Sequence, residues 1–239
     1  MSAAPPWLVS TVVPRLAAEL RAADERSASA PPPGGAGEGV RQAAVLLLFA
    51  DIDIDTDTDT DIDTGPSAPQ RAEILLTLRA DHLRAHAGQV AFPGGRAEPG
   101  DPDPARTALR EASEEVGLDA SSVTVVAELP VLRVVPSNND VTPVVAWWHR
   151  PGPLVPDRSE VSAVARTRLA QLADPAVRIG VRHPAGGVWP GFRLPELLVW
   201  GFTAWVLDRV VAACGLEVGW DRSPVLEMPP PASRPLRAG

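Results

Sequence analysis

Hydrophobic and polar positions along the chain predict strands and helices that alternate without a regular repeat. The run AAVLLLFA at residues 43–50 is continuous and apolar, which is typical of a strand buried on both faces. Other strands are predicted at residues 72–79, 122–129, 141–148, 177–183 and 187–194, with a short extended piece at 88–95 that ends in a glycine turn. Helices are predicted at residues 7–24 (restarting at Pro14), 104–116, 160–172 and 196–213. Strands mixed in this way with single helices indicate an α/β sandwich.

The predicted helix at 104–116 has the clearest boundaries. Asp103 is suited to the N-cap, Pro104 to the first helical position and Gly117 to the position that ends the helix. At about 100° per residue the apolar side chains gather on one face, which is formed by Ala105, Ala108, Leu109, Ala112 and Val116. This stripe predicts the buried face of the helix.

Composition divides the chain into three stretches. Residues 1–40 are predicted to form an N-terminal helix and a flexible linker, residues 41–215 the main domain, and residues 216–239 a Pro-rich tail. Inside the main domain, residues 51–64 (DIDIDTDTDTDIDT) repeat every two residues. Seven like charges on one face of a strand would repel one another, and the Gly and final Glu of an EF-hand loop are missing. We therefore expect a disordered, solvated loop there.

Charge and hydropathy exclude several kinds of partner. The formal net charge is −8, but seven of the negative charges lie in the Asp repeat, which leaves about −1 for the rest of the chain. No basic stripe is present, so a nucleic-acid partner is not expected. The longest strongly apolar run, residues 197–207, is shorter than the ~20 residues that cross a bilayer, so a membrane partner is not expected either.

The single cysteine bears on the cellular compartment. Cys214 has no second cysteine with which to form an internal disulfide, and a reducing compartment fits. It follows an apolar helical run, which indicates a buried, inert thiol rather than a nucleophile. The N-terminus also lacks the pattern of a secretory signal peptide. We therefore expect a cytoplasmic protein.

The candidate chemistry lies on the helix at 104–116. Glu111, Glu114 and Glu115 fall within an arc of about 100° on a face different from the apolar one. Most acidic runs on helices are solvated surfaces, and that interpretation stays open. Against it, Glu111 and Glu115 are like charges four residues apart, and Glu114 and Glu115 lie in the last turn, where the helix dipole disfavours anions. A divalent cation would reverse both costs, because carboxylate oxygens suit hard cations.

The same segment resembles the Nudix box, the signature of the Nudix hydrolase family. The second half of that signature, Arg-Glu-apolar-x-Glu-Glu-x-Gly-apolar, is matched throughout by Arg110, Glu111, Ala112, Glu114, Glu115, Gly117 and Leu118. The first half departs from it. Gly95 is followed by Asp101 in place of Glu, and eight residues rather than seven separate Asp101 from Arg110. The resemblance implies a Nudix-type α/β/α sandwich with a mixed central sheet.

A second signature just upstream resembles the coenzyme A diphosphatases, a subfamily of the Nudix hydrolases. It lies in LLTLRADHLRAHAGQVAFPGG, and its matching positions are Leu75, Leu76, Thr77, Arg79, Ala80, Arg84, Gly88 and Phe92 to Gly95. The resemblance as a whole covers about residues 43–213. It implies hydrolysis of coenzyme A or an acyl derivative to 3′,5′-ADP and a 4′-phosphopantetheine product.

The resemblance also implies roles for single residues. Glu111, Glu114 and Glu115, with the carbonyl of Gly95, would hold Mg²⁺ or Mn²⁺, which neutralises developing charge and lowers the pKa of a bound water. Arg110 would orient the glutamates through an ion pair with Glu114. The remaining assignments are phosphate binding by Arg79 and Arg84 and close ligand approach at Gly94 and Gly95. Glu111 is a candidate base, and Glu160 is the downstream acid to test for that role.

Other interpretations stay open. A Nudix enzyme could instead act on a different nucleoside diphosphate derivative, such as ADP-ribose or a dinucleotide. A non-catalytic nucleotide-binding regulator on the same scaffold is a third hypothesis, although the intact Glu111, Glu114 and Glu115 speak against it. In each case the partner is a small nucleotide, and a homodimer is compatible with the sequence.

Overall fold

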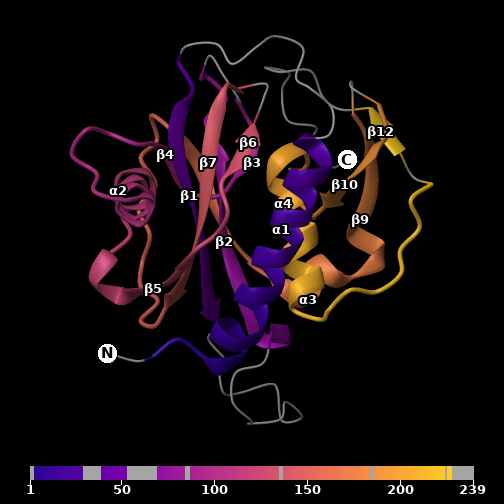
Figure 1. The fold of residues 1–239 in the computed structure, drawn as a ribbon, viewed down its shortest axis with the longest axis horizontal. Helices are drawn as coiled ribbons and strands as arrows, with labels where there is room; N and C mark the ends of the chain where they lie inside the picture. The colour runs from indigo at the N-terminus through magenta and orange to yellow at the C-terminus, as the bar shows by residue number, and fades with distance from the viewer. Residues whose placement is uncertain are drawn as a thin grey trace.

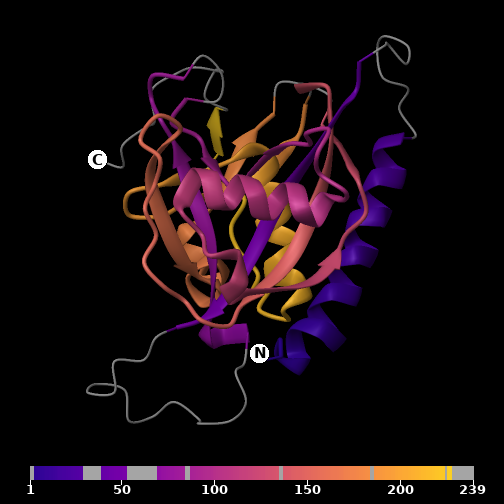
Figure 2. The same cartoon turned by 90° about the vertical axis from the view of Figure 1, so that its left-hand side faces the viewer.

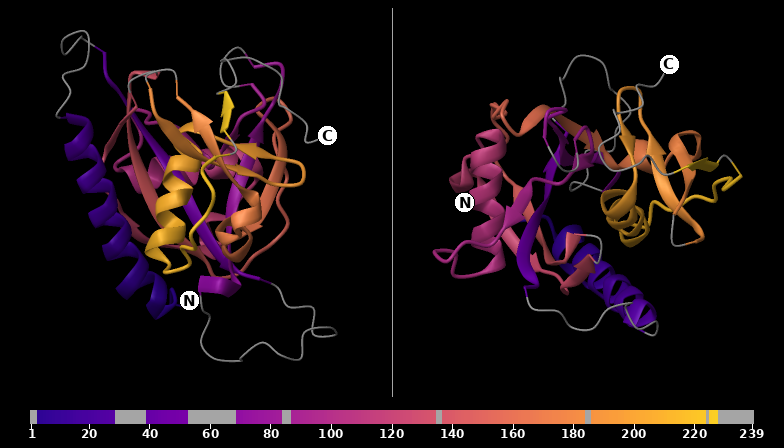
Figure 3. Two further views of the ribbon diagram at one scale, coloured as in Figure 1. Left: turned by 90° about the vertical axis from the view of Figure 1, so that its right-hand side faces the viewer. Right: turned by 90° about the horizontal axis from the view of Figure 1, so that it is seen from above.

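The fold consists of layers stacked side by side (Figure 1). The computed structural model describes residues 3–28, 39–52, 69–83, 87–134, 137–183, 186–223 and 225–227. A large sheet stands between helix α2 on one face and helices α1 and α4 on the other, and a smaller sheet lies beyond α4 (Figure 3). The expected α/β/α sandwich is therefore present, with the smaller sheet as an additional layer.

The large sheet is mixed, as expected. Within the described residues it has eight strands, which are β1 (Arg41–Asp51), β2 (Ala72–Arg79), β3 (Val90–Ala91), β4 (Gly94–Arg96), β5 (Val123–Glu128), β6 (Leu132–Val134), β7 (Asn139–Trp148) and β8 (Val161–Arg168). The order is β3-β2-β1-β7-β5, and β4 pairs with β1, β6 with β7 and β8 with β2. The β1–β7 pair is parallel and the other pairs are antiparallel. β1 and β7 thus form the centre of the sheet.

The remaining elements surround this sheet. The helices are α1 (Val13–Ala28), preceded by a π-helical turn (Leu8–Val12), α2 (Pro104–Val116), α3 (Leu169–Ala173) and α4 (Gly201–Ala213), and short 3-10 turns cover residues 69–71, 120–122 and 175–177. The smaller sheet contains β9 (Arg178–Arg182), β10 (Val188–Arg193), β11 (Leu198–Val199) and β12 (Val225–Glu227), in the order β11-β10-β9-β12. None of the helices in the described part of the chain is long and apolar enough to cross a membrane.

Helix α2 lies across one face of the large sheet (Figure 2). Its expected caps are present, because Asp103 accepts a hydrogen bond from the N–H of Arg106 and Gly117 ends the helix in the left-handed conformation with φ of 68°. The predicted apolar stripe is the buried face. Ala108, Ala112 and Val116 are fully buried against β1 and β7 residues, while Ala105 and Leu109 pack at the margin. This packing sets the direction of the acidic face.

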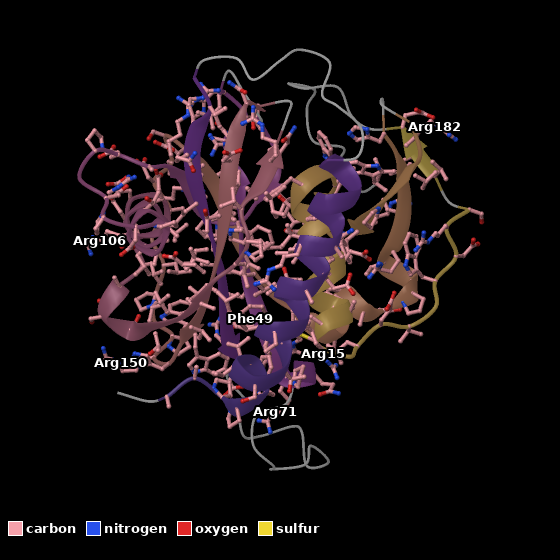
Figure 4. The ribbon with its side chains drawn as sticks, in the orientation of Figure 1. Arg15, Phe49, Arg71, Arg106, Arg150 and Arg182 are labelled. Atoms are coloured by element: carbon pink, nitrogen blue, oxygen red, sulfur yellow. The ribbon has the colours of Figure 1, made fainter. Side chains whose placement is uncertain are left out.

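Helix α1 and the turn before it share a core with the other face of the sheet. Leu8, Val12, Leu16 and Leu20 are fully buried. Trp7 meets the rings of Phe49 and Trp147 edge-on, with centroids 6.4 and 6.2 Å away. Figure 4 shows Phe49 close to α1. The division of the chain at residue 40 stays a prediction, but the helix N-terminal to it packs onto the main sheet.

Two predicted elements were wrong. Residues 160–172 were expected to be helical, yet Val161–Arg168 form strand β8 and helix α3 occupies Leu169–Ala173. The reason is that β8 pairs along the whole of β2, which buries Val161 and Thr167 and overrides the local preference of its Ala and Arg residues for a helix. The helix expected at 196–213 starts at Gly201, because Leu198 and Val199 pair with β10. The three-residue strands β6 and β12 were not predicted.

Several other expectations concern segments only partly described. The described part of the Asp-rich segment 51–64 is Asp51 and Ile52, and most of the linker before residue 40 and the end of the tail also lie outside the described residues. Cys214 is buried, and burial raises the pKa of its thiol to about 12, in agreement with an inert residue.

We predict that α1 contributes to the stability of the whole fold. Leu16→Ala should lower the free energy of unfolding by about 2–5 kcal/mol, because it removes a fully buried side chain and leaves a cavity. The exposed Glu19 on the same helix provides the control, and Glu19→Ala should change that free energy by less than about 0.5 kcal/mol. Urea denaturation measures both. Equal midpoints for Leu16→Ala and wild type would show that α1 is peripheral.

Candidate functional site

The acidic face of α2 meets a glycine turn at the start of β4. Gly94 and Gly95 pair with Val45 and Ala44 of β1. The N–H of Gly94 donates a hydrogen bond of 3.1 Å to Oε2 of Glu115. A Cβ on Gly95 would lie 2.5–2.6 Å from the carboxyl atoms of Glu111, and a Cβ on Gly94 (φ +151°) would collide with the β1 backbone. The missing Cβ at Gly95 therefore lets the Glu111 carboxylate lie directly against the main chain, and the missing Cβ at Gly94 lets the turn pack against β1.

Burial dominates the electrostatics of these two carboxylates. The side chain of Glu115 is 4% exposed. Burial raises the pKa of Glu115 to about 7, and the Gly94 hydrogen bond and the positive charge of Arg79 oppose the rise only in part. Burial also raises the pKa of Glu111, against the opposing charge and hydrogen bond of Arg110. The charges of Glu114 and Glu160 also raise the pKa of Glu111, and those of Glu111 and Glu160 raise the pKa of Glu115. An added cation would therefore be favourable beside this pair.

Arg110 lies at the centre of an ion-pair network on α2. Its guanidinium is 2.9 Å from Oε2 of Glu114, as expected for this pair, and 3.1 Å from Oε1 of Glu111. It also donates to the carbonyl of Arg96 in β4, at 2.9 Å. Arg110 therefore ties the end of β4 to the helix and fixes the orientation of two glutamates.

Asp101 completes this network, a role that the sequence analysis did not assign. Its carboxylate is 5% exposed and accepts hydrogen bonds from Nε and Nη2 of Arg110, Oγ1 of Thr107 and the N–H of Glu98. The Arg110 hydrogen bond is the main reason that the pKa of Asp101 falls to about 2. The shorter Asp thus reaches Arg110 despite the additional residue in the loop. The signal in the sequence that could have indicated this role was the acidic residue six positions after Gly95.

Glu160 lies at the end of a loop that is anchored to the site. The N–H of Asp157 donates to the carbonyl of Glu115 at the end of α2, and the N–H of Ala80 donates to the carbonyl of Glu160. The negative charge of Glu160 contributes to the raised pKa values of both Glu111 and Glu115. The chain thus brings a third acid near Glu111 and Glu115 from a distant segment, although β8 and the short α3 take the place of the helix predicted at residues 160–172.

Arg79 ends strand β2 beside the same carboxylates. Its Nη1 lies 3.7 Å from Oε1 of Glu115, and its side chain is 26% exposed. The Nε of Arg79 is buried and has no hydrogen-bond partner within the described part of the chain. Arg84, the other arginine expected at phosphate, lies outside the described residues. Of the residues expected at the site, Arg79, Gly94, Gly95, Arg110, Glu111 and Glu115 are therefore brought together.

Glu114 differs from its two neighbours on α2. Its carboxylate is 60% exposed and is engaged by Arg110. In keeping with this, no three His, Cys, Asp or Glu side chains among the described residues are gathered closely enough to hold a metal ion. Mg²⁺, however, is usually bound by one or two carboxylates together with water and substrate phosphates. Glu111 and Glu115, both against the Gly94–Gly95 main chain, fit that smaller donor set.

We predict a pH-dependent contribution of Asp101 to stability. Its pKa is lowered from 3.8 to about 2 in the folded state, so its ionised form stabilises the fold above about pH 4, and this contribution is lost as the pH falls toward 2. The difference in unfolding free energy between wild type and Asp101→Asn, measured by urea denaturation, should therefore shrink over that range. Asp81→Asn, at an exposed aspartate outside this network, is the control. A difference for Asp101→Asn that stays constant from about pH 5 to pH 2 would contradict the ion pair.

Comparisons with known proteins identify the family of the chain. A family model described as the NUDIX domain matches residues 67–185. The protein named "Uncharacterized Nudix hydrolase NudL" from Escherichia coli K12 is 38% identical over 152 residues, which cover 60% of this chain and 76% of that protein. Its namesake from Escherichia fergusonii is 39% identical with the same coverage. The crystal structure of the Nudix hydrolase RenU from M. smegmatis has a TM-score of 0.42 at 27% identity, over 57% of this chain and 75% of that one. The chain belongs to the Nudix family and is a Nudix hydrolase.

Proposed function

We propose that this Nudix hydrolase cuts the pyrophosphate bond of coenzyme A or an acyl-coenzyme A, giving 3′,5′-ADP and a 4′-phosphopantetheine product. The observation that carries the proposal is the pair of carboxylates, Glu111 and Glu115, that lie against the Gly94–Gly95 turn with Arg79 alongside. Two carboxylates that can hold a divalent metal ion, with one guanidinium beside them, suit a diphosphate bound together with that metal ion.

The site residues divide into those that hold the cation and those that hold the substrate. Glu111, Glu115 and the main chain of Gly95 would hold Mg²⁺ or Mn²⁺, and Glu114 would join them on leaving Arg110. When bound, such an ion lowers the pKa of a water ligand and neutralises charge on the phosphates. Arg110 keeps Glu111 in place through its 3.1 Å contact.

Substrate phosphates are assigned to the open side of the same turn. Gly94 and Gly95 have no side chains to keep a ligand from the backbone. Arg79 has an unpartnered buried Nε and a partly exposed side chain, so it retains donors for a phosphate oxygen. Arg84 follows in the same signature and is proposed as a second phosphate ligand on the resemblance alone.

The preference for coenzyme A is supported by where its signature falls in the fold. The segment from Leu75 to Gly95 contains most of β2, all of β3 and the start of β4. Arg79 is the last residue of β2 and Gly94 is the first residue of β4. Both contact Glu115 of α2. The residues that resemble the coenzyme A diphosphatases therefore frame the proposed site, whereas the Nudix box alone is shared by enzymes for other nucleotides.

We expect metal-stimulated cleavage of coenzyme A at its pyrophosphate. Purified protein is incubated with coenzyme A, ADP-ribose or diadenosine polyphosphates plus Mg²⁺ or Mn²⁺, and the products are identified by mass spectrometry. Glu111→Gln and Glu115→Gln should each lower the turnover number at least ~100-fold, since each removes charge that would hold the cation. The exposed Glu196 supplies the control variant Glu196→Gln. Near-normal turnover in Glu115→Gln would refute the proposed role of the buried pair.

Glu160 is proposed as the base that takes the proton of the attacking water. Its loop is fixed by the hydrogen bonds to Ala80 and to the end of α2, and its charge is felt at both buried glutamates. Glu160→Gln should lower the turnover number about 10²–10⁴-fold, as for loss of a general base. Mn²⁺ affinity, measured by electron paramagnetic resonance, should change little. A large loss of Mn²⁺ affinity would instead make Glu160 a metal ligand, and unchanged turnover would leave Glu111 as the base.

A further inference from the structure

The contact between Arg79 and Glu115 joins two residues that the proposed function uses separately. Oε1 of Glu115 lies 3.7 Å from Nη1 of Arg79, and Oε2 of Glu115 accepts the hydrogen bond from the N–H of Gly94. Among the described residues, Arg79 is the basic side chain within ion-pair distance of this carboxylate. A cation bound at Glu115 would therefore come close to a guanidinium that already carries a positive charge.

The surroundings of Arg79 leave it able to move. At 3.7 Å the contact is longer than a good charge-assisted hydrogen bond, for which 2.7–2.9 Å is usual. Arg79 lies where the β2–β8 register shifts, at the end of its strand, and about a quarter of its side chain is exposed. Its Nε is buried without a partner in the described structure. The side chain thus has unused donors and an outward path.

We propose that Arg79 is the resident counter-charge of Glu115 and exchanges this carboxylate for a substrate phosphate when the metal binds. This inference is conditional on the proposed function, because it needs both a cation at Glu115 and a phosphate nearby. Without metal, the guanidinium balances a carboxylate that is 4% exposed. With metal, two positive charges compete for Glu115, and the arginine is released toward the substrate.

The exchange couples metal binding to substrate binding. Each ligand removes part of the cost of binding the other, and thermodynamic linkage requires the effect to be reciprocal. A permanent structural ion pair is the alternative, in which Arg79 stays against Glu115 when the metal binds. Loss of the Arg79 charge favours metal in both cases, so tighter metal binding by an Arg79 variant is required by the exchange, and the exposure of residue 79 with and without metal separates the two possibilities.

The first test measures Mn²⁺ affinity without nucleotide by electron paramagnetic resonance, with all variants compared at the same pH and ionic strength. Arg79→Gln should bind Mn²⁺ about 3–10-fold more tightly than wild type, since the competing cation is gone. Arg182→Gln is the matched control, because Arg182 pairs with Glu227 in the smaller sheet, across the molecule from α2 (Figure 4). Unchanged or weaker binding by Arg79→Gln overturns the exchange.

The second test uses the absence of lysine from the sequence. Arg79→Lys retains the positive charge and introduces the chain's single side-chain amine, whose reaction with an amine reagent can be followed by peptide mass spectrometry. Mn²⁺ alone should raise the labelling rate at residue 79 at least about threefold, by freeing the amine from Glu115. Addition of α,β-methylene-ADP, which cannot be cut at that bond, should lower it again. A rate indifferent to Mn²⁺ contradicts the exchange.

The two proposals fail in different ways. If wild-type protein binds no Mn²⁺ and cleaves none of the nucleotides, the proposed function is wrong and the exchange falls with it. If wild type binds Mn²⁺ and cleaves coenzyme A while Arg79→Gln leaves Mn²⁺ affinity unchanged, the exchange alone is wrong.

Discussion

The close approach of α2 to the turn at Gly94 and Gly95 is the constraint on which the rest of the site depends. No Cβ separates the turn from the helix, so the carboxyl of Glu111 lies against the Gly95 main chain and Glu115 receives the N–H of Gly94. The approach is held from both sides. β4 pairs with β1, and the apolar stripe of α2 packs on β1 and β7. A side chain at Gly95 would displace the carboxyl of Glu111 from the turn, and one at Gly94 would collide with the β1 backbone.

The acidic face of α2 would destabilise the helix on its own, and the surrounding residues offset that destabilisation. Clustered anions in the last turn oppose the helix dipole and repel one another. Arg110 offsets this for Glu111 and Glu114, and Asp101 in turn holds Arg110. Glu115 has a weaker partner in Arg79 and a raised pKa. The negative charge of Glu115, the most buried of the three glutamates, is therefore the least well balanced by neighbouring positive charge. This is expected where a bound cation supplies the balancing charge.

The capping residues and hydrophobic periodicity of the sequence predicted both ends of α2 correctly, but local sequence preference failed to predict β8. The difference has a physical cause. The caps Asp103 and Gly117 and the 3.6-residue period of the apolar stripe are properties of the segment itself. Strand β8 exists because β2, far away in sequence, pairs with it. The site divides in the same way. The glutamates and glycines could be chosen from motifs. The contact of Arg79 with Glu115 and the charge that Glu160 brings near them depend on how distant strands and loops return to α2.

Three glutamates that look equivalent in a motif have different surroundings in the fold. Glu115 is buried and bonded to the main chain, Glu111 is partly buried beside Gly95, and Glu114 is mostly exposed and held by Arg110. A carboxylate gains most from a cation when water and other partners are excluded, because the local dielectric is then low. The contribution to metal binding should therefore follow burial, with Glu115 and Glu111 ahead of Glu114. The helix supplies three acids, and the glycine turn decides which of them matter most.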